Sequence, residues 1–132
     1  MHKILIVDDE PIVIRVIRLA LAKEGYEVDT APNGKVALEK IQASAPDALI
    51  TDIEMPIMTG EELCKELHSS MPEREFPIFV ATSLTALEHR FWSKSIPNLS
   101  FLEKPISARK LVAELSTYFR SLNSKIPGVG HE

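Results

Sequence analysis

The chain has 132 residues, of which 45% are hydrophobic and 26% are charged, a balance typical of one globular domain with a sizeable core. The formal net charge of −4 disfavours a surface for nucleic acid or for an anionic membrane, because such surfaces are basic. A single cysteine excludes an internal disulfide, and no apolar run approaches the roughly 20 residues of a membrane span. The N-terminus lacks the length and cleavage site of a signal peptide, so we expect a cytoplasmic protein.

Short apolar runs alternate along the chain with longer stretches of helical spacing. The runs are mostly continuous rather than alternating, which predicts strands buried on both faces. The predicted strands cover residues 4–7, 28–31, 48–51, 78–81 and 100–102. A strand followed by a helix, repeated five times, predicts an α/β fold with a parallel sheet and helices on both faces.

Each predicted helix has a recognisable first residue. Proline is tolerated in the first turn, and Asn, Ser and Thr side chains can cap the free backbone N–H groups. Two of the starts, at Thr59 and Thr85, carry Glu three residues later and are predicted to be capping boxes. The helix starts are marked by Pro11, Asn33, Thr59, Thr85 and Ser107. We expect a domain over residues 1–122 and a flexible tail or linker stub over 123–132, where Pro and Gly occur without apolar periodicity.

Polar side chains follow four of the predicted strands. Because the carboxyl ends of parallel strands share one edge of a sheet, we expect these side chains to converge there. They are Asp8 and Asp9 after the first strand, Asp52 after the third, Thr82 after the fourth and Lys104 after the fifth. Three carboxylates facing one lysine would be balanced by Mg²⁺, which prefers oxygen ligands and commonly bridges carboxylates to phosphate. One carboxylate could then act as a nucleophile toward a phosphoryl group, with the Thr82 hydroxyl and Lys104 binding the phosphoryl oxygens.

Four segments in this order, ILIVDDEP, LITDIEMPIMTG, PIFVATS and FLEKP, resemble the receiver domain of two-component response regulators, as in chemotaxis regulators. The resemblance covers about residues 3–122. It implies a flavodoxin-like (βα)5 fold with strand order 2-1-3-4-5. It implies that Asp52 accepts a phosphoryl group from a phosphohistidine of a sensor histidine kinase or phosphotransfer protein. It also implies that Asp9, Asp52 and the backbone carbonyl of Glu54 bind Mg²⁺ directly, with Asp8 acting through a water molecule.

The resemblance assigns roles to further residues. Thr82 would hydrogen-bond the phosphoryl group and report its presence, and Lys104 would pair with it next to a cis bond before Pro105. Phe101 aligns with an aromatic residue that swings inward on activation. An unknown downstream protein or effector domain would read the altered face, without direct contact of this domain with nucleic acid or membrane. Such a domain catalyses only its own phosphorylation and dephosphorylation and is not an enzyme with substrate turnover.

The sequence departs from the family pattern in places. Thr59 stands where Asp is common, and Pro97 lies in the connection before the last strand, which should therefore differ locally. Leu84, two residues beyond Thr82, is predicted to slow hydrolysis of the phosphorylated form by limiting access of water. Cys64 is predicted to be a packing thiol, and Trp92 to be either a packing residue or part of a partner surface.

Other functions compete with this interpretation. A phosphatase of the haloacid dehalogenase type needs a DxDx[TV] motif, but Asp52 is followed by Ile-Glu-Met-Pro. Flavin binding would need a glycine- or hydroxyl-rich loop after the first strand, where this chain is acidic. The remaining alternative is a receiver fold that docks partners without phosphorylation, and the intact acids, Thr82 and Lys104 argue against it. The sequence leaves open whether the domain acts alone or as part of a longer protein.

Overall fold

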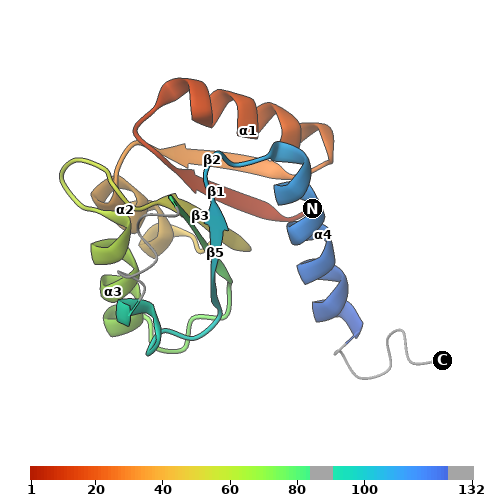
Figure 1. Ribbon diagram of the computed structural model, residues 1–132. Helices are drawn as coiled ribbons and strands as arrows, with labels where there is room; N and C mark the ends of the chain where they lie inside the picture. The colour runs from red at the N-terminus through yellow and green to blue at the C-terminus, as the bar shows by residue number, and fades with distance from the viewer. Residues whose placement is uncertain (84–90, 125–132) are drawn as a thin grey trace.

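Five parallel strands form one sheet in the order β2-β1-β3-β4-β5 (Figure 1). The computed structural model describes residues 1–83 and 91–124. The strands are β1 (Lys3–Val7), β2 (Glu27–Ala31), β3 (Ala48–Asp52), β4 (Ile78–Thr82) and β5 (Leu99–Glu103). The helices in the described residues are α1 (Pro11–Lys23), α2 (Gly34–Ala43), α3 (Gly60–Ser70) and α4 (Ala108–Ser124). The predicted flavodoxin-like fold and its strand order are confirmed.

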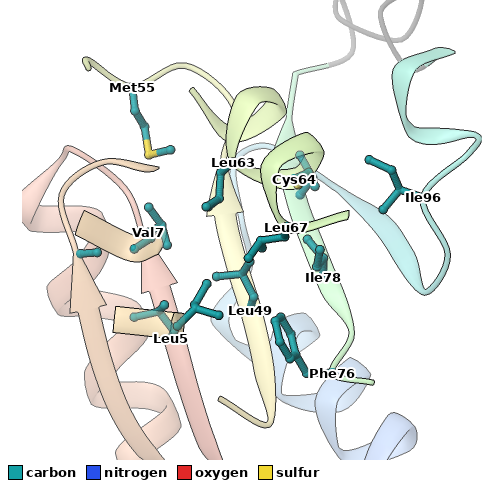
Figure 2. Packing of buried hydrophobic residues seen from close by; sticks show 14 residues of the cluster. Leu5, Val7, Leu49, Met55, Leu63, Cys64, Leu67, Phe76, Ile78 and Ile96 are labelled. Atoms are coloured by element: carbon teal, nitrogen blue, oxygen red, sulfur yellow. The ribbon is translucent and has the colours of Figure 1, made fainter. Parts of the chain in front are cut away.

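The sheet separates two hydrophobic cores. Figure 1 shows α2 and α3 together on one side of the sheet and α1 and α4 on the other. Alternate residues of β1 divide between these cores, since Leu5 and Val7 pack beneath α2 and α3 whereas Ile4 and Ile6 pack beneath α1 and α4. Figure 2 shows the first core, in which α3 side chains meet residues of β3 and β4.

Burial on both faces holds for the inner strands but not for the outer ones. Every residue of β3 and β4 is buried, as the continuous apolar runs predicted. The prediction was wrong for β2 and β5, where most residues are partly or fully exposed. Each of these strands pairs with one neighbour in the described part of the chain and lies at an edge of the sheet. Edge strands carry more polar side chains because one side of the strand is not covered by a partner strand.

The predicted helix starts are present wherever the structure describes them. Pro11 occupies the first turn of α1, and the Asn33 side chain accepts a hydrogen bond from the Val36 N–H of α2. Thr59 and Glu62 form a reciprocal capping box at the start of α3. Lys110 N–H donates to the Ser107 hydroxyl at the start of α4. The capping box predicted at residues 85–88, and Leu84, lie outside the described residues.

Two residues with several possible roles contribute to packing. Cys64 is fully buried on α3, and this burial raises the pKa of its thiol to about 12, so the predicted packing role is confirmed. Trp92 lies in a 3₁₀ turn at residues 91–93 and is partly buried against the first core.

Pro97 lies in the loop before β5, where its carbonyl accepts a hydrogen bond from Arg74. None of the helices in residues 1–83 and 91–124 combines the length and hydrophobicity needed to cross a membrane.

Candidate functional site

Three carboxylates meet at the carboxyl ends of β1 and β3. Asp8 and Asp9 directly follow β1, and Asp52 is the last residue of β3. These two strands are neighbours in register, with Val7 paired to Thr51, so Asp8 and Asp52 lie side by side. One carboxylate oxygen from each of the three aspartates lies within 4.8 Å of the others. Asp8 and Asp52 are buried, with 4% and 5% of their surface exposed, whereas Asp9 faces solvent.

The carboxyl of Asp8 is buried beside other acids, which makes its charged form unfavourable. Burial is the main cause that raises its pKa, and the neighbouring charges of Asp52 and Glu10 raise it further. The Glu10 N–H, which donates to Asp8 Oδ1 at 2.9 Å, and the ammonium of Lys104 oppose this increase. The net pKa of Asp8 is raised, so ionised Asp8 costs free energy that a bound cation would offset.

Asp52 is held by two donors, which directly follow β3 and β5. The ammonium Nζ of Lys104 lies 2.6 Å from Asp52 Oδ1, and the Ile53 N–H donates to the same oxygen at 2.8 Å. Lys104 follows β5, and its own N–H donates to the Thr82 carbonyl at 2.9 Å, next to the predicted cis bond before Pro105. Partial burial lowers the pKa of Lys104, but the hydrogen bond to Asp52 and the charges of Asp52, Asp8 and Glu10 outweigh it and raise the pKa overall. Lys104 therefore remains an ammonium beside the carboxylate.

The hydroxyl and aromatic residues predicted for the site occupy the neighbouring strands. Thr82 is buried at the end of β4, between Asp52 on β3 and Lys104 after β5. Phe101 pairs with Val80, two residues before the Thr82–Glu103 pair, and its ring lies in a T-shaped arrangement with Trp92, with centroids 6.0 Å apart. Within the described residues, the acids and Lys104 are therefore gathered together and Thr82 lies at the same edge, whereas Phe101 packs against Trp92 and the first core. Glu54 is exposed in the loop that follows β3.

The donor set at this edge fits a hard divalent cation. All three side chains offer carboxylate oxygens, which Mg²⁺ prefers over nitrogen and sulfur. Oxygens that share one Mg²⁺ lie within about 4 Å of each other. A separation of 4.8 Å therefore needs only small side-chain adjustments. Among the described residues, the side chains that could hold the ion are the three aspartates.

Two features of the loop after β3 were not predicted from the sequence. Gly60 leaves no room for a side chain, because a Cβ atom at that position would lie 2.1 Å from the Asp52 carbonyl oxygen. Ile57 adopts a left-handed backbone conformation, with φ of 72°, in the loop between Asp52 and α3. The Thr59-Gly60 pair was visible in the sequence, but nothing local indicated its contact with Asp52.

Comparisons with known proteins agree with this geometry. The family described as response regulator receiver domain matches residues 4–116. The response regulator MprA of Mycobacterium ulcerans is 34% identical over 118 residues, which cover 89% of this chain and 50% of that protein, and the chain spans about half the length of the curated relatives it matches. The chemotaxis response regulator CheY4 of Vibrio cholerae has a solved structure that is 33% identical, with a TM-score of 0.80 over 89% of this chain and 98% of that one. A CheY-like receiver domain protein from Methanospirillum hungatei is 26% identical, with a TM-score of 0.84 over 96% and 99% of the two chains. This chain therefore belongs to the response regulator receiver domain family.

Proposed function

We propose that this receiver domain is a phosphorylation-dependent switch of a two-component system, in which Asp52 accepts a phosphoryl group in the presence of Mg²⁺. The observation that carries the proposal is the convergence of three carboxylates, one of which, Asp52, is held by Lys104. Membership of the receiver family supports a signalling role rather than that of an enzyme with substrate turnover. The donor would be a phosphohistidine on a sensor histidine kinase or a phosphotransfer protein.

The proposed reaction forms an acyl phosphate. A carboxylate oxygen of Asp52 attacks the phosphorus, the N–P bond of the phosphohistidine breaks, and the imidazole leaves and takes up a proton from solvent. Lys104 and the Ile53 N–H both hold Oδ1, so they orient the carboxylate for attack. When bound by the aspartates and the Glu54 carbonyl, Mg²⁺ would supply positive charge opposite the carboxylates and the phosphoryl oxygens. The Thr82 hydroxyl would donate a hydrogen bond to the transferred group.

The surface beside the acids suits a protein donor. Ile12, Val16 and Leu19 form an apolar stripe on α1, and they are 77%, 54% and 62% exposed. A groove of about 460 Å³ runs between this helix and the Lys104–Pro105 segment and has Asp8 in its wall. A donor protein that covers this stripe would bring its histidine to the edge of the sheet where Asp52 lies, and we assign the kinase or phosphotransfer protein to this face.

The switch would pass from the site to the edge of the sheet at β5. A phosphoryl group adds close to two negative charges, and Thr82 would move toward it. Phe101 would then turn inward, away from Trp92, and a downstream partner would read the surface around β5 and α4. Because Phe101 would leave Trp92, the fluorescence of Trp92 should change when beryllofluoride and Mg²⁺ are added. The signal can be assigned to Trp92, since the chain has one tryptophan. The Phe101→Leu variant should lose this response.

The direct test is uptake of phosphate. Wild-type protein incubated with acetyl phosphate and Mg²⁺ should gain the mass of one phosphoryl group, and Asp52→Asn or removal of Mg²⁺ with a chelator should abolish the gain. If the wild type stays unmodified with acetyl phosphate and with phosphorylated kinase, the proposal fails and docking without phosphorylation becomes the better account. We also propose a domain boundary near residue 122, two residues before the end of α4 at Ser124, and a location in the cytoplasm.

A further inference from the structure

The loop after β3 closes back onto the residue where it starts. The Gly60 N–H, at the beginning of α3, donates to the Ile53 carbonyl at 2.7 Å. A Cβ atom at Gly60 would lie 2.1 Å from the carbonyl oxygen of Asp52 and 3.0 Å from its carbonyl carbon. Both are backbone atoms, so no change of rotamer could relieve the contact. Gly60 therefore packs directly against the peptide group of Asp52.

The two sides of this contact are both anchored. On one side, the capping box fixes the start of α3, with Glu62 N–H donating to the Thr59 hydroxyl at 3.1 Å. The helix is held from below by Leu63 and Leu67, which are fully buried in the core shown in Figure 2. On the other side, β3 continues into the sheet, where Asp52 is paired with Ala81. Space for a side chain at position 60 must therefore come from the backbone at residues 52–54.

We propose that Gly60 is a positioning residue for the phosphoryl acceptor: the missing side chain lets α3 hold the Asp52 peptide where the carboxylate meets Lys104 and the other acids. This inference rests on the proposed function of Asp52. A non-bonded carbon–oxygen contact needs about 3.3 Å, so an added methyl group would displace the acceptor backbone by roughly 1 Å. A misplacement of this size at a reacting group can cost about 100-fold in rate, and metal ligands tolerate only about 0.2 Å.

The chain offers a matched control in a second glycine, outside this loop, that packs against a different residue of it. Gly34, the first residue of α2, also lacks room for a side chain, because a Cβ atom there would lie 2.8 Å from Met58 Cγ and 2.8 Å from the Met58 carbonyl oxygen. Its N–H donates to that carbonyl at 3.0 Å. Gly34→Ala would therefore strain the loop as Gly60→Ala does, but it would push Met58 instead of Asp52. A general loosening of the loop would affect both variants, whereas a positioning role would affect only Gly60→Ala.

The experiment compares wild type, Gly60→Ala and Gly34→Ala. Their folding is checked by circular dichroism, Mg²⁺ affinity is measured by isothermal titration calorimetry, and the rate of phosphorylation is measured with acetyl phosphate. We expect Gly60→Ala to be phosphorylated at least 10-fold more slowly than wild type and to bind Mg²⁺ more weakly. We expect Gly34→Ala to stay within about 3-fold of wild type in both measurements, even where its melting temperature falls. Equal rates for wild type and Gly60→Ala, or equal losses in the two variants, would overturn the inference.

Two further measurements separate this inference from the function on which it rests. A crystal structure of metal-free Gly60→Ala should show the Asp52 carbonyl displaced by roughly 1 Å, whether or not the wild type accepts phosphate. An unmoved Asp52 carbonyl would contradict the inference. If Gly60→Ala does not fold, two milder variants test the inference. Thr59→Ala removes the side-chain cap of α3, and Asn33→Ala removes the side-chain cap of α2. Amide NMR shifts of residues 52–54 should move in Thr59→Ala and not in Asn33→Ala, and the reverse result would refute the role of α3.

Discussion

Lys104 Nζ lies 2.6 Å from Oδ1 of Asp52, and this ion pair connects the ends of β5 and β3 across the intervening β4. The carboxylate is buried, so the ammonium is the positive charge that balances it in the metal-free protein. A buried carboxylate that loses its cation is destabilising, because its desolvation is no longer compensated. The pair therefore couples the fold to the chemistry of the site.

The pair predicts a loss of stability at alkaline pH. The pKa of Lys104 is raised above its ordinary value of 10.5, so its stabilising contribution is complete below pH 10.5 and disappears as the pH rises through the raised pKa. Lys104→Met should lower the free energy of unfolding at pH 7 by about 1–3 kcal/mol, because Asp52 is left without its partner. Urea denaturation of wild type and Lys104→Met measures the free energy of unfolding between about pH 7 and 11, a range that includes the ordinary pKa of lysine. The alkaline loss should be smaller in Lys104→Met, and an unchanged loss would assign it to other groups.

Asp8 is expected to destabilise the metal-free protein at neutral pH, whereas Lys104 stabilises it. Burial raises its pKa above 3.8, so the protonated form is favoured in the folded state, and stability in the absence of metal falls as the pH rises from 3.8 through the raised pKa. Asp8→Asn removes this cost and should stabilise the metal-free protein at pH 7 by roughly 1 kcal/mol. Thermal melts with a chelator measure the difference.

The same melts with Mg²⁺ provide the control. Mg²⁺ should raise the melting temperature of the wild type, because an ion that binds only the folded state stabilises it. The increase should be smaller for Asp8→Asn, which offers one carboxylate fewer. A metal-free Asp8→Asn that is less stable than wild type would show that Asp8 stabilises the fold through its hydrogen bond from Glu10 instead.

Features of the fold and the site could be predicted where the sequence pattern and strand topology determine them, but not where they depend on contacts between distant residues. The meeting of Asp8 with Asp52 could be predicted, because parallel strands with acidic ends must bring those ends to one edge. The exposure of β2 and β5 could not be predicted from their apolar runs alone, since an apolar run does not say whether its strand has one neighbour or two. Only the strand order implied by the family resemblance places both strands at the edges of the sheet. The clearance at Gly60 was missed for a related reason. Its local pattern indicates only a helix cap, and its contact with Asp52 exists only in the folded loop.

Ile57 gives a prediction that sequence patterns alone would not suggest. Its φ of 72° lies in the left-handed region, and its side chain is 76% exposed, so little packing offsets the strain. For L-residues this conformation costs roughly 1–2 kcal/mol, and asparagine tolerates it better than a β-branched residue does. Ile57→Asn should therefore raise the free energy of unfolding by about 1 kcal/mol in urea denaturation. Ile57→Val keeps the β-branched side chain and should give no gain, so equal stabilisation by the two variants would contradict the backbone explanation.

The apolar stripe on α1 predicts a difference between protein and small-molecule phosphodonors. Val16→Glu places a charge within the stripe without touching the acids, so phosphorylation by acetyl phosphate should stay within about 2-fold of wild type, as expected for a surface substitution. Phosphorylation by the kinase or phosphotransfer protein should weaken about 10-fold or more through KM, because a charge in an apolar contact must be desolvated on binding. Leu122→Glu is the matched control, since Leu122 is also an exposed apolar residue but lies near the end of α4, in the wall of a different groove. Equal effects of the two variants would show that charge on any exposed apolar residue disturbs the donor, and the stripe would lose its assignment as the docking face.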